Sequence, residues 1–372
     1  VEERAAALPH LGAGASAARG WDGSFQAIFG DFFPAGQTTQ SAEVTLSQTL
    51  FAWGKVGSAI RAAKSGILLA EDQVEHYRQA AVRDVTEAFT DVLLAKRLAG
   101  IARETLAQRE RQLAEAEKRL ALGTATDYDV LAARVARDNQ RPEVIRSENL
   151  IAQALDRLKL VLAEEQAPLD VEGELEADLV DPPHLEEVAR TALETRPDLR
   201  QLAHGVDAYR LLVRIRGADD KPRLDLRGSA GWKWFGAGDL SADGKTWGLG
   251  VYLTFPFFDG MATRGRILQA RSDLTQAELD LARAQDGVWV EARTAVDAAR
   301  VAAEIVRGLA GTVDQARKLL EMSEKGHEFG VKTKLEVDDA LVNLRQAEGN
   351  LAKARRDYLV ARTNLLFVQG KL

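Results

Sequence analysis

The apolar residues of the chain recur every seven positions over two long stretches. In the second stretch every seventh residue from Ile267 is apolar as far as Ala316, and a parallel series begins at Ala292. The first stretch carries two such series as well, starting at Ile60 and Val85. A sustained seven-residue repeat predicts coiled-coil helices, and two series on one helix predict two packing seams. A helix from residue 262 to 326 would be roughly 95 Å long.

A turn is predicted at the end of each long helix. Gly123 lies in RLALGTATDYDVLAAR and Gly330 lies in GHEFGVKTKLEVDDAL. Glycine readily adopts the left-handed conformation that ends helices, and the apolar periodicity resumes beyond both glycines. Each long helix is therefore expected to reverse at its glycine into a returning helix.

The segments before the long helices alternate with a period of two. In PRLDLRGSAGWKW the even-numbered residues from Leu224 to Trp234 are mostly apolar, and the odd-numbered ones are mostly polar or charged. TWGLGVYLTF alternates in the same way, and so do residues 11–17 and 42–50. This alternation predicts four strands of about ten residues, arranged in two hairpins with one apolar and one polar face.

The two halves of the chain share one register. The turn glycines are 207 residues apart (330 − 123), and the same offset relates Phe51 to Phe258 and Ile60 to Ile267. A constant offset from a strand through two helices predicts an internal duplication.

Composition excludes several classes of function. The net charge of −7 and the pI near 5.5 give no basic surface for nucleic acid. There is no cysteine and there are only five histidines, so neither a thiolate nor a soft-metal site is expected. No apolar run is long enough for a transmembrane helix. Hydrolase and metalloprotease motifs are absent, so we predict no enzyme activity, cofactor or metal. Because the chain begins at Val1, a signal peptide is expected to have been removed.

The apolar face of the predicted strands leaves two interpretations open. It could pack on the core of a soluble protein, but every nearby amphipathic helix is already committed to a coiled-coil seam. The alternative is a transmembrane barrel with tryptophans at its rims, and we assign Trp232, Trp234 and Trp247 to these rims. Known barrels have about eight strands or more, so four strands require the chain to oligomerise.

With these elements the chain resembles the TolC-type outer-membrane efflux protein family. The resemblance covers essentially the whole sequence. It depends on the order of strand hairpin, long helix, glycine turn and returning helix in each half. It also depends on TLFAWGK and PFFDG at the junctions between strands and helices, on ETRPDL before the second strand pair, and on the two turn sequences.

The resemblance implies an α+β membrane protein built from duplicated units of a strand hairpin and long helices. Three copies would form a homotrimer with a twelve-stranded β-barrel, continued by a coiled-coil α-helical tunnel across the periplasm. Residues 1–6 would be the end of a helix whose beginning precedes this sequence, and a lipid-bearing cysteine could have preceded it. The implied segments are 1–53 (first barrel hairpin), 54–163 (first tunnel hairpin), 164–221 (equatorial linker and helix), 222–259 (second barrel hairpin) and 260–372 (second tunnel hairpin).

The resemblance also implies a function and its partners. The protein would be the passive exit channel of a tripartite efflux pump or a type I secretion system. Its partners would be outer-membrane lipid, an inner-membrane pump and a periplasmic adaptor (membrane fusion) protein. The adaptor would dock at the tip turns around Gly123 and Gly330. The cargo is not predicted, because selection occurs mainly in the pump.

The acidic turn of the second hairpin acquires a role from the resemblance. Glu336 and Asp339 match the acidic residues that narrow the periplasmic aperture in the family, and three copies would gather around one axis. Clustered carboxylates favour cations and raise one another's pKa. The positions of the inter-helix contacts that close this end are Asp129, Tyr128, His327 and Lys332, which suggests an ion pair between Lys332 and Asp129.

Two alternatives remain open at this point. A periplasmic adaptor would also contain a long helical hairpin, although it would have one hairpin instead of two duplicated units. A soluble coiled-coil scaffold would explain the seven-residue repeats but would expose the apolar face of the strands. Both should be soluble without detergent, whereas a channel should remain with outer membranes.

Overall fold

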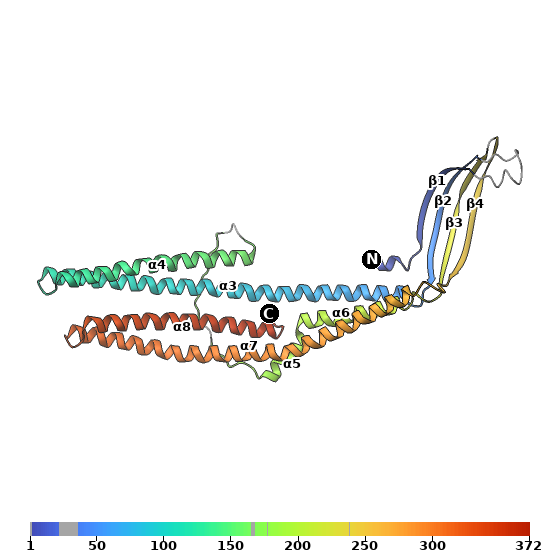
Figure 1. Ribbon diagram of the computed structural model, residues 1–372. Coiled ribbons are helices and arrows are strands. Elements are labelled where there is room, and N and C mark those ends of the chain that lie inside the picture. The colour runs from blue at the N-terminus through green and yellow to red at the C-terminus, as the bar shows by residue number, and fades with distance from the viewer. Residues whose placement is uncertain (1, 22–35, 165–167, 177, 238) are drawn as a thin grey trace. The chain divides into compact units, whose positions relative to one another are not determined.

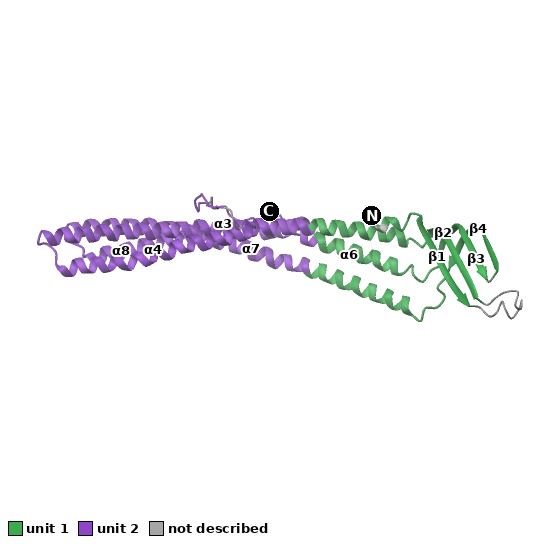
Figure 2. Ribbon diagram, turned by 90° about the horizontal axis from the view of Figure 1, so that it is seen from above, with its two compact units in different colours: residues 1–72, 200–283 green, residues 73–199, 284–372 purple. Residues whose placement is uncertain are grey.

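The computed structural model describes residues 2–21, 36–164, 168–176, 178–237 and 239–372 (Figure 1). Val1 and residues 22–35 of the predicted first barrel hairpin lie outside the described residues, as do residues 165–167 and 177 of the predicted linker. The chain divides into two compact units (Figure 2). One unit joins residues 1–72 to 200–283, and the other joins residues 73–199 to 284–372. Each unit therefore combines segments from both halves of the sequence.

The first unit contains a short helix, α1 (Glu2–Ala5), and an antiparallel sheet with strand order β1-β2-β3-β4. The described strands are longer than the ten residues predicted from the alternation, because each extends beyond the segment in which apolar and polar residues alternate regularly. Their bounds are β1 (His10–Trp21), β2 (Gly36–Phe51), β3 (Arg223–Ala237) and β4 (Leu240–Thr254).

The strand register separates apolar from polar side chains. Val44 of β2 lies opposite Ala13 of β1 and Ala230 of β3, and Ala230 lies opposite Trp247 of β4. Because directly opposite residues point to the same side of a sheet, these residues share one face with the other apolar positions of the alternation. Thr45 and Ser229, one position further along, lie on the polar face.

Each long helix begins after two consecutive residues with positive φ. Before α3 these are Trp53 (φ 51°) and Gly54 (φ 75°), and before α7 they are Gly260 (φ 65°) and Met261 (φ 69°). Positive φ is uncommon for residues other than glycine, and in each pair one glycine relieves part of that strain. The junction sequences TLFAWGK and PFFDG therefore contain the sharp turn that leads from strand to helix.

The helices of the two halves have matching bounds. Helix α3 (Lys55–Ala121) and helix α7 (Ala262–Glu328) each have 67 residues. Helix α7 starts and ends 207 residues after α3 (262 − 55 and 328 − 121). Returning helices follow both, α4 (Asp127–Leu162) and α8 (Lys334–Val368). Two further helices, α5 (Leu185–Thr195) and α6 (Pro197–Arg216), precede β3.

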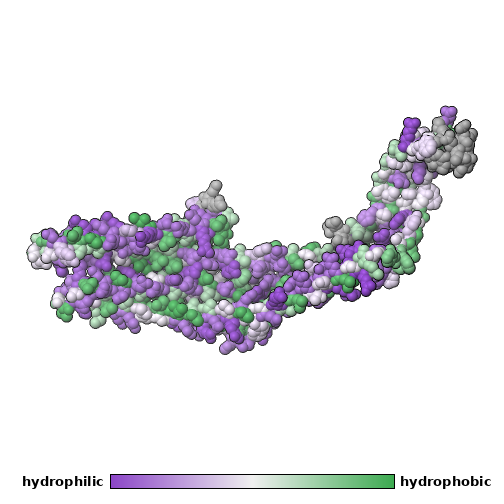
Figure 3. All heavy atoms as spheres, viewed as in Figure 1, coloured by the Kyte–Doolittle hydropathy of each residue, from purple (hydrophilic) through white to green (hydrophobic). Residues whose placement is uncertain are grey.

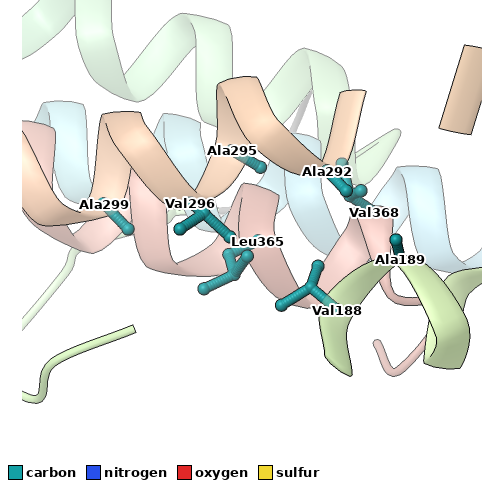
Figure 4. Close-up of a cluster of buried hydrophobic side chains, with 8 residues drawn as sticks. All are labelled: Val188, Ala189, Ala292, Ala295, Val296, Ala299, Leu365 and Val368. Carbon is teal, nitrogen blue, oxygen red and sulfur yellow. The ribbon is translucent and has the colours of Figure 1, made fainter. Parts of the chain in front are cut away.

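The core of the second unit consists largely of small side chains between helices. One cluster joins Val188 of α5 to Ala292, Ala295 and Ala299 of α7 and to Leu365 of α8 (Figure 4). Alanine lets helix backbones approach closely, so long helices can pack without bulky residues between them. The hairpin tips have their own clusters, which include Leu113 with Val130 and Val313 with Leu341.

The linker between the halves is fixed to the helices of the second unit. Lys96 Nζ lies 2.5 Å from Asp170 Oδ1, and the guanidinium nitrogen Nη2 of Arg307 lies 2.8 Å from Asp181 Oδ1. The buried Tyr358 hydroxyl accepts a hydrogen bond from the Val180 amide (3.0 Å) and donates one to the Asp178 carbonyl (3.1 Å). Its side chain therefore fixes the linker to α8.

None of the helices among the described residues is both long and apolar enough to span a bilayer. On the visible face of the helices, apolar and polar residues are interspersed (Figure 3).

Candidate functional site at the helical turns

The first turn, between α3 and α4, is held by backbone hydrogen bonds. Gly123 has φ 72°, its amide donates to the Leu120 carbonyl (2.9 Å), and the Thr124 amide donates to the Arg119 carbonyl (2.8 Å). These bonds form a Schellman motif, which satisfies carbonyls at the end of α3. Helix α4 then starts with a capping box in which Thr126 and Asp129 each accept a hydrogen bond from the other's amide.

The second turn, between α7 and α8, repeats this arrangement. Gly330 has φ 74°, its amide donates to the His327 carbonyl (3.0 Å), and the Val331 amide donates to the Gly326 carbonyl (2.8 Å). Thr333 and Glu336 form the capping box of α8. Both turn glycines predicted from the sequence therefore end their helices in a left-handed conformation.

Glu336 carries the most perturbed carboxylate of the two turns. It accepts hydrogen bonds from Lys332 Nζ (2.5 Å) and from the Thr333 amide (2.7 Å). These donors stabilise the charged form, with Lys332 as the largest contributor, and they lower the pKa of Glu336 to about 2. In the single chain Glu336 is therefore firmly ionised, whereas clustering of carboxylates would raise its pKa.

The predicted ion pair between Lys332 and Asp129 is wrong for the single chain. Lys332 pairs with Glu336, four residues later on its own turn. Asp129 is occupied by the amide (2.8 Å) and hydroxyl (2.7 Å) of Thr126, which hold the pKa of Asp129 below its usual value. Asp129 and Glu336 are therefore both engaged by hydrogen bonds within their own turns.

The other two predicted latch residues differ in their environments. Tyr128 is 79% exposed. His327 Nδ1 lies 3.0 Å from the Lys332 carbonyl oxygen. A carbonyl only accepts, so Nδ1 carries the hydrogen and donates it. His327 thus stabilises its own turn.

Asp338, between the two predicted gate acids, makes one of the contacts that link the two hairpins. Its Oδ1 lies 2.5 Å from the guanidinium nitrogen Nη1 of Arg109 and 3.4 Å from Gln112 Nε2, both on α3. The side chains of Arg109 and Asp338 are only 14% and 28% exposed. The sequence did not identify this pair, because the two residues are 229 positions apart. The internal duplication gives no hint of it either, since Arg109 corresponds to Ala316 and Asp338 corresponds to Leu131.

Asp339 has a different environment. It is exposed, and among the described residues its carboxylate takes part in no ion pair. Of the two predicted gate acids, Asp339 is therefore the one whose charge is not engaged within its own chain.

A groove of about 540 Å³ lies between the hairpin tips. All four long helices or their turns contribute to its lining, which includes Arg119 and Asp129 from the first hairpin and His327 and Lys334 from the second. Most of the lining residues are polar or charged, and Ala116, Ala125 and Val337 add apolar surface. Within the described part of the chain no cluster of three acidic or histidine residues could hold a metal ion.

The predicted rim tryptophans lie on one face of the sheet. Trp232, Trp234 and Trp247 all occupy the apolar face according to the register. Trp247 is 83% exposed, and Trp232 Nε1 donates to Asp243 Oδ2 (2.9 Å). Tryptophans are enriched at boundaries between water and lipid, where the ring is in apolar surroundings and the ring nitrogen finds a hydrogen-bond partner, as that of Trp232 does.

The sequence matches the outer membrane efflux protein family over residues 1–164 and 188–371. Over 383 residues it is 27% identical to alkaline protease secretion protein AprF of Pseudomonas aeruginosa, covering 99% of this chain and 78% of AprF. Over 389 residues it is 25% identical to outer membrane protein TolC of Escherichia coli, covering 100% of this chain and 76% of TolC. The fold is similar to the Campylobacter jejuni CmeC outer membrane channel, with a TM-score of 0.82, 18% identity and coverage of 100% and 79%.

Proposed function

Because the chain belongs to the outer membrane efflux protein family, we propose that three copies of it form a passive exit channel with a gate at the helical turns. Members of this family are channels of efflux and secretion systems, and the chain is accordingly an outer-membrane protein that extends into the periplasm. Membership of this family argues against the alternatives of a periplasmic adaptor or a soluble scaffold.

The observation that carries the proposal is the uncovered apolar face of the sheet. Along β4 this face presents Trp247 (83% exposed), Leu249 (66%), Val251 (58%) and Leu253 (69%). Such an exposed patch is rare on a soluble monomer and is expected where lipid covers it. The opposite face carries threonines, serines and glycines, as expected for a water-filled lumen.

Four strands are too few to close a barrel, and β1 and β4 leave one edge each. Three copies would supply twelve strands, and pairing of β1 with β4 of the next copy would remove every open edge. The helical hairpins of the three copies would then form a helical tunnel.

The gate is assigned to Glu336 and Asp339, with Asp339 as the residue whose charge is unengaged in its own chain. Three copies of Asp339 near a threefold axis would attract cations and impede large anionic solutes. Because Lys332 and Asp129 are not paired within one chain, a latch that uses them with Tyr128 and His327 acts between copies. An adaptor is expected to dock at the turns around Gly123 and Gly330, where Leu122 (78% exposed) and Val331 (79%) are available.

Conductance in planar bilayers tests the gate. Asp339→Asn changes the charge alone, whereas Glu336→Ala would also remove the cap of α8, so Glu336→Gln is the better partner substitution. The double variant should change conductance and weaken block by a trivalent cation added to the periplasmic side. Asp243→Asn, in the sheet, is the control and should leave the block intact. Unchanged current and unchanged block in the double variant would remove both acids from the gate.

Detergent-extracted protein tests the channel itself. The outer-membrane fraction should contain it, and its mass in solution should be three times that of one chain. A monomer that stays dissolved without detergent would contradict the proposed function.

A further inference from the structure

The polar face of the sheet carries two arginines at the end where β2 and β4 lead into the long helices. Arg223 is the first residue of β3, and Arg227 follows it on the same face. Their side chains are 50% and 53% exposed. Asp225 lies between them on β3, and the register places Thr49 of β2 and Tyr252 of β4 opposite Asp225. We call Arg223 and Arg227 the guanidinium pair.

A buried carboxylate holds the guanidinium pair in place. Asp225 Oδ2 lies 2.9 Å from Arg223 Nε and 3.6 Å from Arg227 Nη2. The Thr49 hydroxyl donates to Asp225 Oδ1 (3.1 Å), and the Asp225 side chain is only 8% exposed. The guanidinium carbon of Arg227 lies 5.2 Å from the centre of the Tyr252 ring, which adds a cation–π contact. Both arginines are therefore positioned by the sheet itself.

The guanidinium pair gives this end of the polar face a net positive charge. Among the described residues Asp225 is the single acidic partner of both arginines, so each copy has one excess positive charge there. Further along the same face, Glu43 and Lys233 carry opposite charges that cancel. Each guanidinium has five N–H donors, so several donors are left for a ligand.

Small residues lie beside the guanidinium pair on the polar face. Gly250 of β4 is directly opposite Arg227, and Gly248 and Gly244 follow at alternate positions. A Cβ added at Gly14, Gly244 or Gly248 would meet no atom within 4 Å. Barrels of about eight strands are filled by their side chains, whereas barrels of about sixteen leave an aqueous channel. In a barrel of twelve strands, the long arginine side chains would therefore reach into a lumen that the glycines leave open.

The fold does not require these charges. Strands β1 and β3 each begin immediately after a proline and belong to the same sheet. Where β3 has Arg223, Asp225 and Arg227, the corresponding residues of β1 are His10, Gly12 and Gly14. A strand of this sheet can thus form without the charged cluster, which favours a role for the cluster in binding.

We infer that the guanidinium pair forms a binding ring for oxyanions inside the barrel. The inference rests on the proposed trimeric channel, in which the polar face lines the lumen. Two guanidinium groups and one carboxylate from each copy would surround one axis, with one excess positive charge per copy. Guanidinium groups bind carboxylate and phosphate oxygens through paired hydrogen bonds. The ring would therefore retain solutes that carry carboxylate or phosphate groups, whereas the acidic turns attract cations.

Ion selectivity in planar bilayers tests the ring. Arg227→Gln leaves one arginine for Asp225 in each copy, so the excess positive charge disappears. Under a gradient of potassium chloride, its reversal potential should shift toward a greater preference for potassium. Block by inorganic tripolyphosphate, added on the side opposite to the periplasm, should weaken roughly tenfold because charge-assisted hydrogen bonds are lost.

The matched control removes the same charge from the other face of the sheet. Lys245 of β4 lies opposite Trp232, on the apolar face. Lys245→Gln changes the net charge of the chain as Arg227→Gln does, but it leaves the lumen unaltered. Its reversal potential and its block by tripolyphosphate should both equal those of the parent protein.

Asp225→Asn tests the sign of the effect. Asparagine keeps an oxygen that can accept from Thr49 and Arg223, but it removes one negative charge from each copy. The reversal potential should therefore shift toward chloride, and tripolyphosphate should block at lower concentration. A general disturbance of the sheet would move Asp225→Asn and Arg227→Gln in the same direction.

The outcomes separate this inference from the proposed function. A parent protein that forms no conducting trimer would overturn the channel and the ring together. A conducting trimer in which Arg227→Gln keeps the reversal potential and the block of the parent would overturn the ring while the channel stands. The ring is also overturned if Lys245→Gln reproduces the effect of Arg227→Gln, or if Asp225→Asn shifts both quantities in the same direction as Arg227→Gln.

Discussion

The two helical hairpins have almost the same backbone but different side chains where they meet their neighbours. Helices α3 and α7 are equal in length, and each ends in a Schellman motif followed by a threonine capping box. The residues that set these turns recur in both halves, as Gly123 matches Gly330 and Thr126 matches Thr333. The comparison teaches that the two halves share the residues that set their turns, whereas side chains along the helices differ, as Arg109 of α3 corresponds to Ala316 of α7.

The turns themselves differ in charge. The third residue of α4 is Asp129, and that of α8 is Glu336. Lys332 stands where the first turn has Ala125, so only the second turn has an ammonium beside its capping acid. The hairpin with the additional charge of Lys332 is the one that carries the proposed gate, where the local charge determines which ions approach.

The largest effect is expected from breaking the ion pair between Arg109 of the first hairpin and Asp338 of the second. Arg109→Met leaves Asp338 half-buried without its main donor, and should destabilise the contact between the hairpins by about 1–3 kcal/mol. Hydrogen exchange of the α8 amides around Asp338 measures this loss. Arg119→Met removes an exposed pair with Glu115 within one helix and serves as the control, with an expected cost of about 0.5 kcal/mol or less. Equal costs for the two variants would contradict the assigned importance of the Arg109 pair.

The sequence predicted those parts of the fold that depend on local pattern. The alternation predicted the strands and their apolar face, and the seven-residue repeat with Gly123 and Gly330 predicted both long helices and their turns. These features are encoded by residues that are near one another in the chain. The family resemblance, which is confirmed, was recognised from the order of these elements and added the outer-membrane location.

The contacts of the candidate site were less predictable. Lys332 and Asp129 carry opposite charges, and their positions suggested an ion pair. Instead, Asp129 is hydrogen-bonded to Thr126 and Lys332 to Glu336. Contacts between residues so near in the chain prevail because ordering them costs little chain entropy. The Arg109 pair joins helices whose relative rotation depends on the packing of many small side chains. Such a rotation cannot be deduced from one sequence, so the decisive partner of Asp338 was missed.

A second prediction tests whether the two turns are equivalent in backbone. Gly123→Ala and Gly330→Ala place a side chain at φ 72° and 74°, with no atom within 4 Å of the added Cβ at either site. The cost is therefore conformational, about 1–2 kcal/mol, and should be the same in both variants. Hydrogen exchange of the adjoining amides provides the measurement. A clear difference between the two would mean that a neighbouring copy contacts one turn and not the other.

A third prediction concerns the capping boxes. Thr126→Ala and Thr333→Ala each remove the hydroxyl that accepts from the third residue of the following helix (3.3 Å in both turns). Each should cost about 1 kcal/mol in the local stability of the first turn of α4 or α8. The serine variants retain the hydroxyl and should behave almost as the parent. A serine variant as damaging as alanine would shift the explanation to packing of the threonine methyl group.

The smallest effect, and the one that best separates the turns, concerns the pKa of Glu336. Its folded pKa of about 2 lies below the ordinary value of 4.5, so its charge stabilises the folded turn above pH 4.5. That contribution fades as the pH falls from 4.5 through 2. Lys332→Met removes the main cause of the shift and should raise the pKa of Glu336 toward 4.5, while the Thr333 amide keeps it somewhat below. The titration can be followed by carbon NMR of glutamate-labelled protein, with Glu336→Gln to assign the resonance. A midpoint above 4.5 in the parent protein would mean that carboxylates of neighbouring copies outweigh Lys332, and would place Glu336 in a crowded acidic ring.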